Sequence, residues 1–444
     1  MTNRTVGLQR LRIGLAFLIV LSLLSAGGVA RSRNLAASSS SLMCTTGGPN
    51  PTFTLTAGTG MIKMPDGNTI FTWSYSPAGG AFQFPGPYLC VTAGDTVTVI
   101  LNNTLPEATS IMFPGMDAVT ANGAPANPEF SGTTLTSLTP TAAANGGSVT
   151  YSFIAARPGT YLYESGTDVT KQVQMGLYGA IVVRPAGTPD CAYDCAQTRF
   201  DPSTEYVMLL SEMDPALHHA IEFGLKYDVT TLHPRYWLIN GRAFPDTIAP
   251  NNSSWTPSQP YSALVHVTVT DPAANIVPAQ QPALVRYLNA GSRNHPFHPH
   301  GQNGRVIARD ASPLVDPTNA DASYETFSST IGSGQTWDET YAFVDQEHFN
   351  PTDNVVPITI PQQQGMTFGP LGATYYSGTP YLGRQGSLPV GTTSLNQCGE
   401  FYMVWHSHAL NEAANYDLGF GGMLTLERID PLPGHQALGT TCSQ

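Results

Sequence analysis

Two pairs of histidines carry the clearest chemical signal in this sequence of 444 residues. His298 and His300 lie in the segment HPFHPHG, and His406 and His408 lie in the segment WHSH. Residues i and i+2 of a β-strand point to the same face, so each pair can present two imidazoles to one point. Two such pairs on neighbouring strands would form a four-nitrogen metal site, for which copper has the highest affinity. The alternative is that these are ordinary core histidines.

The segments that must position these histidines are typical of β-strands. Short runs of β-branched and aromatic residues, bounded by Gly, Pro and Asn, recur without helical periodicity. The expected strands are 95–101, 148–154, 160–164, 180–183, 206–211, 263–270, 284–289, 305–309, 337–344, 401–405 and 423–429. One short helix is expected over 214–223, with Pro215 in its first turn. We expect His218 and His219, which are adjacent on this helix and point apart, to be structural. The pattern predicts an all-β protein built from sandwiches or barrels.

The composition supports a globular β protein and excludes other classes. Only 11% of the residues are charged, 41% are hydrophobic, and there are 43 Gly and 36 Pro. A coiled coil or helical repeat would need abundant charged helix formers, and a disordered chain would need high charge with few apolar residues. The formal net charge is −12 and there is no basic stripe, so we expect no nucleic-acid partner.

The N-terminus is typical of an export signal. Three arginines within the first twelve residues precede an apolar run over 13–24, and small residues follow. We therefore predict a signal peptide over 1–30 and a flexible lead-in over 31–43. The protein would be secreted, periplasmic or at the cell surface, with no membrane span after signal removal. An uncleaved anchor is the alternative, which the shortness of the apolar run disfavours.

Six cysteines follow the signal, and an even number in an exported protein predicts disulfides. The pairs that we expect are Cys191 with Cys195, Cys44 with Cys90, and Cys398 with Cys442. Cys191 and Cys195 lie in the segment CAYDC, close enough for a local bridge. A zinc clip there is disfavoured because neither a companion cysteine pair nor a nearby histidine completes a tetrahedral set.

At the histidine motifs the chain resembles the multicopper oxidases, the laccase-like family of cupredoxin proteins. The segments that carry the resemblance are 84–111, 156–183, 236–248, 285–310 and 400–408. Only one cupredoxin-like unit follows residue 200, so the resemblance implies two domains rather than the family's common three.

The predicted fold is therefore two cupredoxin-like Greek-key β-sandwich domains. The first would cover 44–186 and the second 187–444. Long loops enlarge the second domain, above all an excursion over 346–397.

The resemblance implies a copper cluster held by four HxH-type motifs, of which this chain keeps two. The first motif reads Met112-Phe113-Pro114, and the second begins at Glu164 and reads Glu-Ser-Gly. The third and fourth are the intact pairs in HPFHPHG and WHSH. Half of the eight imidazoles therefore remain.

The blue copper site that the resemblance implies is also incomplete. Its thiolate position is Ser407, whose hydroxyl does not ionise near neutral pH. Its second histidine position is Glu412, and its axial position is Asp417, with Met423 as an alternative. Only His295 remains, so we do not expect laccase activity.

We predict an exported multicopper oxidase-like protein that binds one non-blue copper, or zinc, through the two HxH pairs. Glu164, His295 and Met112 are further candidate ligands at positions that the resemblance implies. Two alternatives stay open: a metal-free cell-surface scaffold or binding module, and a mononuclear-metal oxidoreductase or hydrolase. The sequence identifies neither a catalytic residue nor a substrate. Two-domain members of the family form their cluster between subunits of a trimer, so a homotrimer is one arrangement to test.

Overall fold

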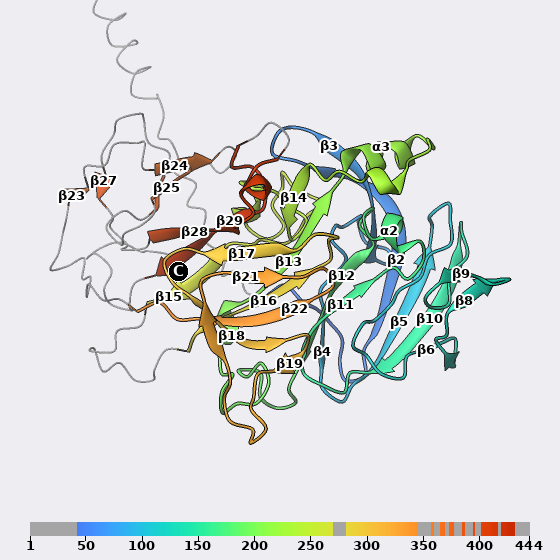
Figure 1. Ribbon diagram of the computed structural model, residues 1–444, viewed down its shortest axis with the longest axis horizontal. Helices are drawn as coiled ribbons and strands as arrows, with labels where there is room; N and C mark the ends of the chain where they lie inside the picture. The colour runs from blue at the N-terminus through green and yellow to red at the C-terminus, as the bar shows by residue number, and fades with distance from the viewer. Residues whose placement is uncertain are drawn as a thin grey trace, which may run out of the picture. The chain divides into compact units, whose positions relative to one another are not determined.

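The computed structural model describes residues 42–269, 281–344, 401–415 and 419–430, together with five short strands within 345–400. Within these residues the protein consists of β-strands and a few short helices, which confirms the predicted all-β class (Figure 1). The predicted signal peptide, Cys398, Asp417 and Cys442 lie outside the described residues. So does the excursion over 346–397, apart from the five strands.

Two sheets form from residues 45–184 and are coloured blue to teal in Figure 1. One has the strand order β1 (Thr45–Thr46), β4 (Leu89–Thr92), β12 (Tyr178–Arg184) and β11 (Gly159–Glu164). The other has the order β3 (Thr69–Pro77), β2 (Thr52–Lys63), β5 (Thr96–Asn103), β10 (Gly147–Ile154), β6 (Thr120–Ala121) and β7 (Ala124–Pro125). A separate hairpin pairs β8 (Glu129–Ser131) with β9 (Thr134–Ser137). Alternate residues of β5 are buried, as expected for a strand with one face on the core.

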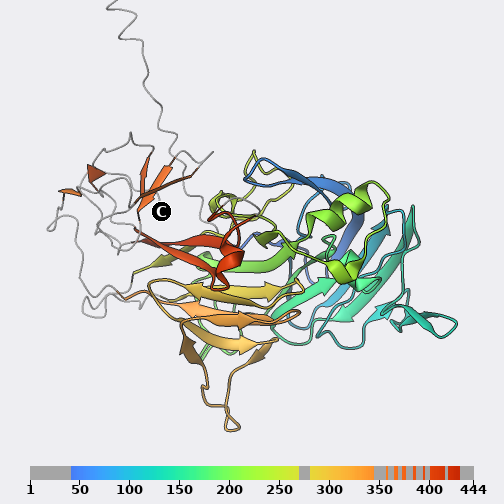
Figure 2. The same ribbon diagram turned by 45° about the horizontal axis from the view of Figure 1, so that its top comes forward.

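Two further sheets form from residues 205–430. One has the order β14 (Tyr236–Ile239), β13 (Glu205–Met213), β16 (Ala283–Asn289), β22 (Thr336–Tyr341), β18 (Gly304–Arg309) and β19 (Ser312–Pro313), and β20 (Tyr324–Thr326) also pairs with β18. The other has the order β15 (Val265–Thr268), β29 (Leu424–Asp430), β28 (Phe401–Ser407), β17 (His295–Pro299) and β21 (Ser329–Ile331). Figure 2 shows β28 and β29 in red above the yellow and orange strands. The small strands pair as β23 (Pro357–Ile358) with β27 (Ser394–Leu395), and as β24 (Gly365–Phe368), β25 (Ala373–Tyr376) and β26 (Arg384–Gly386).

The predicted short helix is present as α3 (Pro215–Glu222). Asp214 caps it by accepting a hydrogen bond from the backbone N–H of Ala216, and Pro215 occupies its first turn, where no intrahelical donor is lost. The other helical segments are α2 (Val169–Gln172) and the 3-10 turns Pro202–Thr204, Val229–Thr231, Asp246–Ile248 and Leu410–Ala413. Among the described residues, none of these helices is long and apolar enough to cross a membrane.

A hydrophobic cluster joins the two pairs of sheets. It combines Leu162 and Val182 from the N-terminal sheets with Leu238 and Leu288 from the C-terminal ones. The rings of Tyr88 and Tyr261 stack nearby with centroids 3.9 Å apart, a geometry that adds to the burial of both rings.

A buried network of charged residues in the C-terminal sheets also contacts the N-terminal ones. Arg286 donates to Glu205 over 2.8 Å and to Asp338 over 3.2 Å, and all three side chains are almost fully buried. Thr160 of β11 donates to Asp338 over 2.6 Å, and Tyr193 donates to the second oxygen of the same carboxylate. Each charge is therefore paired, which is the condition for keeping it in a core.

Candidate metal centre

The structure brings the four predicted histidines together at one end of the pair β17 and β28. The strands are antiparallel, and His298 lies directly opposite His406. The neighbours of His298, Phe297 and Pro299, are buried, so the alternation of the strand turns His298 away from the core. Ring centroids are 4.9 Å apart for His298 and His300, 5.1 Å for His300 and His406, and 5.2 Å for His298 and His408.

Hydrogen bonds orient two of these rings. Nδ1 of His298 lies 2.5 Å from the carbonyl oxygen of Phe327, and Nδ1 of His406 lies 2.7 Å from that of Ser407. A carbonyl only accepts, so both Nδ1 atoms carry the proton and both Nε2 atoms keep a lone pair for a metal. Metal-binding histidines in proteins are commonly held in this way.

One pair of nitrogens already has the spacing of a shared ion. Nε2 of His300 donates a hydrogen bond to Nε2 of His406 over 3.1 Å, because Nε2 of His406 keeps its lone pair, and a metal ion would take the place of the shared proton. Two nitrogens each about 2.0–2.1 Å from one ion would lie at about this distance. Burial and the neighbouring imidazoles lower the pKa of His300, and burial lowers the pKa of His406 although its bond to the Ser407 carbonyl opposes the shift. Both shifts favour the neutral imidazole, which is the form that binds metals.

The ligand atoms of the four histidines are spaced more widely than in an occupied metal site. Among the described residues, one group of three or more His, Cys, Asp or Glu has all its ligand atoms within 4.8 Å of one another, and it lies elsewhere, at Asp190, Cys191 and Cys195. An ion would therefore engage His300 and His406 first. His298 and His408 would complete the set by side-chain rotation. An open cavity of about 620 Å³, lined by His298 and His300 together with Gln302 and Met403, leaves room for the rotation of His298, and the side chain of His408 is exposed.

The structure does not bring Glu164 and Met112 into this cluster. The two residues are bridged to each other, since the N–H of Met112 donates to the carbonyl of Glu164 over 2.7 Å. Both line a separate pocket of about 320 Å³, whose lining contains none of the four histidines. Burial raises the pKa of the Glu164 carboxyl.

His295 lies away from the cluster in a buried network of its own. Its Nδ1 is 2.8 Å from Oε2 of Glu412, and its Nε2 is 3.2 Å from Oε2 of Glu212. Ser407 donates to Glu412 over 2.5 Å. Carboxylates accept these bonds, so both ring nitrogens donate and the imidazole is protonated. Burial alone would lower its pKa, but the two glutamates outweigh burial and raise the pKa to about 9.

Sequence reasoning found three members of this network and missed one. Ser407 and Glu412 meet His295 where the resemblance placed a blue copper site, while Met423 is buried in a hydrophobic cluster with Trp405. Glu212 carried no prediction, although a glutamate inside the buried strand EYVMLLSEM was a signal that an internal partner existed. A Cβ at Gly291 would lie 1.8 Å from Oε2 of Glu212, so only glycine leaves room for this carboxylate.

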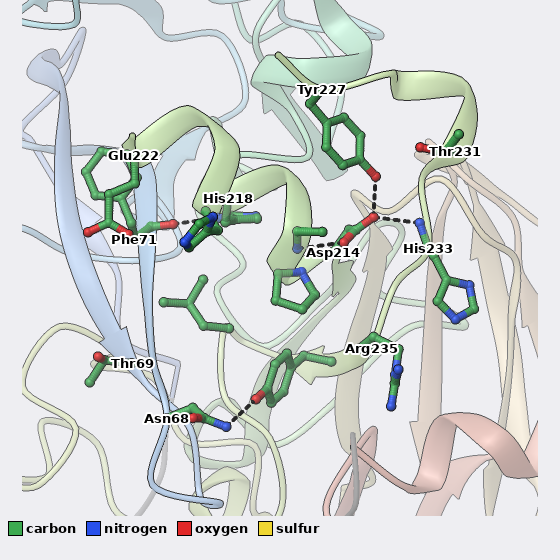
Figure 3. A pocket seen from close by; sticks show the side chains of 15 residues that line it. Asn68, Thr69, Phe71, Asp214, His218, Glu222, Tyr227, Thr231, His233 and Arg235 are labelled. Carbon is green, nitrogen blue, oxygen red and sulfur yellow. Dashed lines mark hydrogen bonds between the residues drawn. The ribbon is translucent and has the colours of Figure 1, made fainter. Parts of the chain in front are cut away.

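A second cavity of about 620 Å³ lies beside α3 (Figure 3). Asp214 organises its wall by accepting from the hydroxyl of Tyr227 over 2.5 Å and from the N–H of His233 over 2.6 Å. His218 is buried, with its ring nitrogens 2.6 Å and 3.1 Å from the carbonyl oxygens of Phe71 and Gln174. These contacts agree with the structural role that we expected for His218.

Comparisons with known proteins point to one family. Residues 78–188 match the family model described as multicopper oxidase. An L-ascorbate oxidase of Brassica rapa subsp. pekinensis is 32% identical over 170 residues, which cover 36% of this chain and 26% of the relative. Laccase-1 of Emericella nidulans is 29% identical over 194 residues, which cover 38% of this chain and 29% of the relative. The matched segments thus span less than a third of these curated relatives.

Solved structures share the fold over most of the chain. A blue copper oxidase from Nitrosomonas europaea superposes with a TM-score of 0.55 at 17% identity, covering 86% of this chain and 85% of that one. The multicopper oxidase mgLAC superposes with a TM-score of 0.52 at 17% identity, covering 86% of each chain. These matches confirm the predicted cupredoxin-type fold. The chain is therefore similar to multicopper oxidases: it matches the family model over residues 78–188 and shares their fold over most of its length.

Proposed function

We propose that this protein binds a single non-blue copper ion through His298, His300, His406 and His408. The observation that carries the proposal is the 3.1 Å separation of the Nε2 atoms of His300 and His406. The carbonyls of Phe327 and Ser407 support it by fixing the Nδ1 protons, so that Nε2 is the ligand atom of His298 and His406. Four neutral imidazoles suit copper and also admit zinc.

Two features of the same strands support a non-blue site without laccase activity. The position between His406 and His408 is Ser407, whose hydroxyl donates to Glu412 and offers no thiolate. His295, the remaining blue-site candidate, has both ring nitrogens on carboxylates. It would have to lose a proton and a buried partner before it could bind a metal.

A bound copper ion would supply one-electron redox chemistry or polarise a ligand bound at its open position. The chain's own contribution is to hold and orient the imidazoles. The open cavity beside His298 and His300 gives solvent access to the ion's position. No substrate is assigned.

Export and assembly belong to the same proposal. The N-terminal sequence pattern supports secretion or transport to the periplasm or cell surface. The partial exposure of the four-histidine cluster is compatible with a homotrimer in which a neighbouring copy covers it. Light scattering on the purified protein distinguishes a trimer from a monomer.

Metal analysis of protein produced without a histidine tag tests the copper proposal. After loading with copper and removal of excess, we expect one equivalent per chain and an electron paramagnetic resonance spectrum with nitrogen hyperfine structure. Sub-stoichiometric metal would overturn the proposal in favour of a metal-free scaffold. The intense blue absorption of a copper–thiolate site would contradict the non-blue assignment.

A further inference from the structure

The loop from Asp190 to Arg199 holds a second set of metal-type ligands, far from the histidines in sequence. Cys191 and Cys195 form a disulfide, and Asp190 precedes the first of them. One ligand atom from each of these three residues lies within 4.8 Å of the others. We propose that this loop is a redox-gated zinc site, closed in the disulfide form and able to bind one Zn²⁺ through Cys191, Cys195 and Asp190 once the disulfide is reduced.

The two oxygens of the Asp190 carboxylate have different neighbours. Its Oδ2 pairs with the guanidinium of Arg199, and its Oδ1 lies 3.7 Å from Sγ of Cys191. A disulfide sulfur carries no hydrogen, so Oδ1 gains no hydrogen bond from it. With a Zn–S distance of about 2.3 Å and a Zn–O distance of about 2.0–2.2 Å, a tetrahedral ion would hold sulfur and oxygen roughly 3.6 Å apart. Arg199 would then act as the outer partner that orients the ligating carboxylate.

The backbone of the loop is held by hydrogen bonds that do not depend on the disulfide. The N–H of Ala192 donates to the carbonyl of Thr198 over 2.9 Å, and the N–H of Phe200 donates to that of Asp190 over 3.0 Å. The hydroxyl of Thr198 accepts from the N–H of Tyr193 over 2.9 Å. The Cα atoms of the two cysteines are 5.1 Å apart. Reduction therefore leaves both sulfurs on a scaffold that keeps them close.

A buried side chain anchors the same loop to the protein core. The hydroxyl of Tyr193, which lies between the two cysteines in sequence, donates to Oδ2 of Asp338 over 2.6 Å. Tyr193 and Phe200 pack in a hydrophobic cluster with Leu284 and Ile307. The loop thus resists the unfolding that often follows the loss of a disulfide.

The other disulfide of the described chain lacks these features. Nη1 of Arg184 lies 3.8 Å from Sγ of Cys44, so the charged group beside the Cys44–Cys90 bridge is a cation rather than a carboxylate. A guanidinium has no lone pair to offer a metal ion, whereas Oδ1 of Asp190 is a metal-type ligand atom. The Cys44–Cys90 bridge therefore serves as a control for the Cys191–Cys195 bridge. Only the cysteines beside Asp190 are expected to bind zinc after reduction.

The chemical step balances with a dithiol as reductant. The dithiol gives up two electrons and two protons and becomes a disulfide, the Cys191–Cys195 bond breaks, and each sulfur gains one proton. Zinc binding then displaces both protons to solvent, because thiolates are the ligands. A water molecule would occupy the fourth position. Thiol–disulfide exchange with a small-molecule disulfide reverses the step: the incoming disulfide takes the two electrons and, with two protons from solvent, becomes two thiols, the Cys191–Cys195 bond re-forms, and the ion is released.

Cobalt and zinc binding to oxidised and reduced protein tests the proposal. The variant His300→Ala/His406→Ala serves as the background, so that metal at the histidines does not obscure the result. Under anaerobic conditions we expect one equivalent of Co²⁺ in the reduced form only, with thiolate-to-cobalt charge-transfer absorption, and its displacement by Zn²⁺. A reduced protein without this absorption would overturn the proposal, and so would equal binding in the oxidised form.

Variants locate the site within the loop. Asp190→Asn should weaken Zn²⁺ binding by at least about 10–100-fold, because it removes a charged ligand and the loss of a group that only orients a ligand already costs this much. Asp194→Asn is the matched control, because Asp194 is an exposed acid of the same loop outside the ligand group. Cys191→Ser/Cys195→Ser should abolish the charge-transfer absorption, and Cys44→Ser/Cys90→Ser should retain it. Equal losses in the two aspartate variants would contradict the assignment, and this comparison needs neither cysteine variant to fold.

Discussion

Strands β17 and β28 carry two histidine environments that differ in burial and in charge. On one side, four imidazoles lie partly exposed, contact backbone carbonyls and each other, and include two that line an open cavity. On the other side, His295 is fully buried between two glutamates and is protonated. In the first environment a metal ion would supply the positive charge. In the second, a proton on imidazole supplies the positive charge, and no ion is needed.

Removal of two cluster imidazoles should have the largest effect. We expect His300→Ala/His406→Ala to weaken copper binding at least about a thousandfold, about 4 kcal/mol, because the two nitrogens already at shared-ion spacing are lost. Isothermal titration with a competing chelator measures the affinity. The control is His219→Ala, an exposed histidine on α3 outside the cluster. Unchanged affinity in the double variant would place copper elsewhere.

Disruption of the buried network should act on stability instead of metal binding. Glu412→Gln removes a charge from a site that also contains His295 and Glu212, and we expect the free energy of unfolding to fall by about 3 kcal/mol. Urea unfolding measures this loss. Glu222→Gln, an exposed change on α3, should stay within about 0.5 kcal/mol of the parent. Copper affinity should be unaffected, and a large drop in it would show that the two environments are not separate.

The pH dependence of stability should distinguish the buried histidine. Its folded-state pKa is raised to about 9, above the usual 6.5, so its contribution is complete below about pH 6.5 and is lost as the pH rises through about 9. The expected slope is about 1.4 kcal/mol per pH unit in that window, or about 2 kcal/mol between pH 7 and 8.5. Metal-free protein followed by urea unfolding at several pH values measures it. The slope should disappear in His295→Gln, and a slope that persists there would assign the effect to another group.

The smallest effect concerns Glu164, which lines a pocket that contains none of the four histidines. Burial raises its pKa, so the ionised carboxylate costs stability above about pH 4.5, and this cost fades as the pH falls. Glu164→Gln should raise the free energy of unfolding by about 1 kcal/mol at pH 7 and leave it almost unchanged at pH 4. A destabilised variant at pH 7 would instead indicate that the carboxylate has a favourable partner.

The parts of the fold that the sequence revealed are those with strong local patterns. Alternating runs such as 148–154 correspond to β10 (Gly147–Ile154), and Pro215 after an acidic cap marked the start of α3. Strands β2 and β3 carried no prediction, although β2 alternates between buried and more exposed residues. Its sequence TFTLTAGTGMIK is rich in Thr and Gly, so its hydrophobic signal is weak, and cross-strand partners rather than propensity determine its pairing.

The candidate site was likewise predictable from the sequence only in part. Spacing of two along a strand was sufficient to group His298 with His300 and His406 with His408. The other side chains that contact these histidine-bearing strands depend on how distant strands are aligned with one another. A local sequence pattern does not reveal that alignment. Glu212, for example, reaches His295 from β13. The bridges Cys44–Cys90 and Cys191–Cys195 are confirmed.

The buried network around Arg286 has a consequence for how the molecule unfolds. Its guanidinium is held by Glu205 and Asp338, while Thr160 from the N-terminal sheets completes the hydrogen bonds of the same carboxylate. Separation of the two pairs of sheets would break the hydrogen bond from Thr160 to Asp338 and the ion pair between Arg184 of β12 and Glu205, and would expose the buried charges to water. We therefore expect one cooperative heat-absorption peak in scanning calorimetry rather than two independent ones.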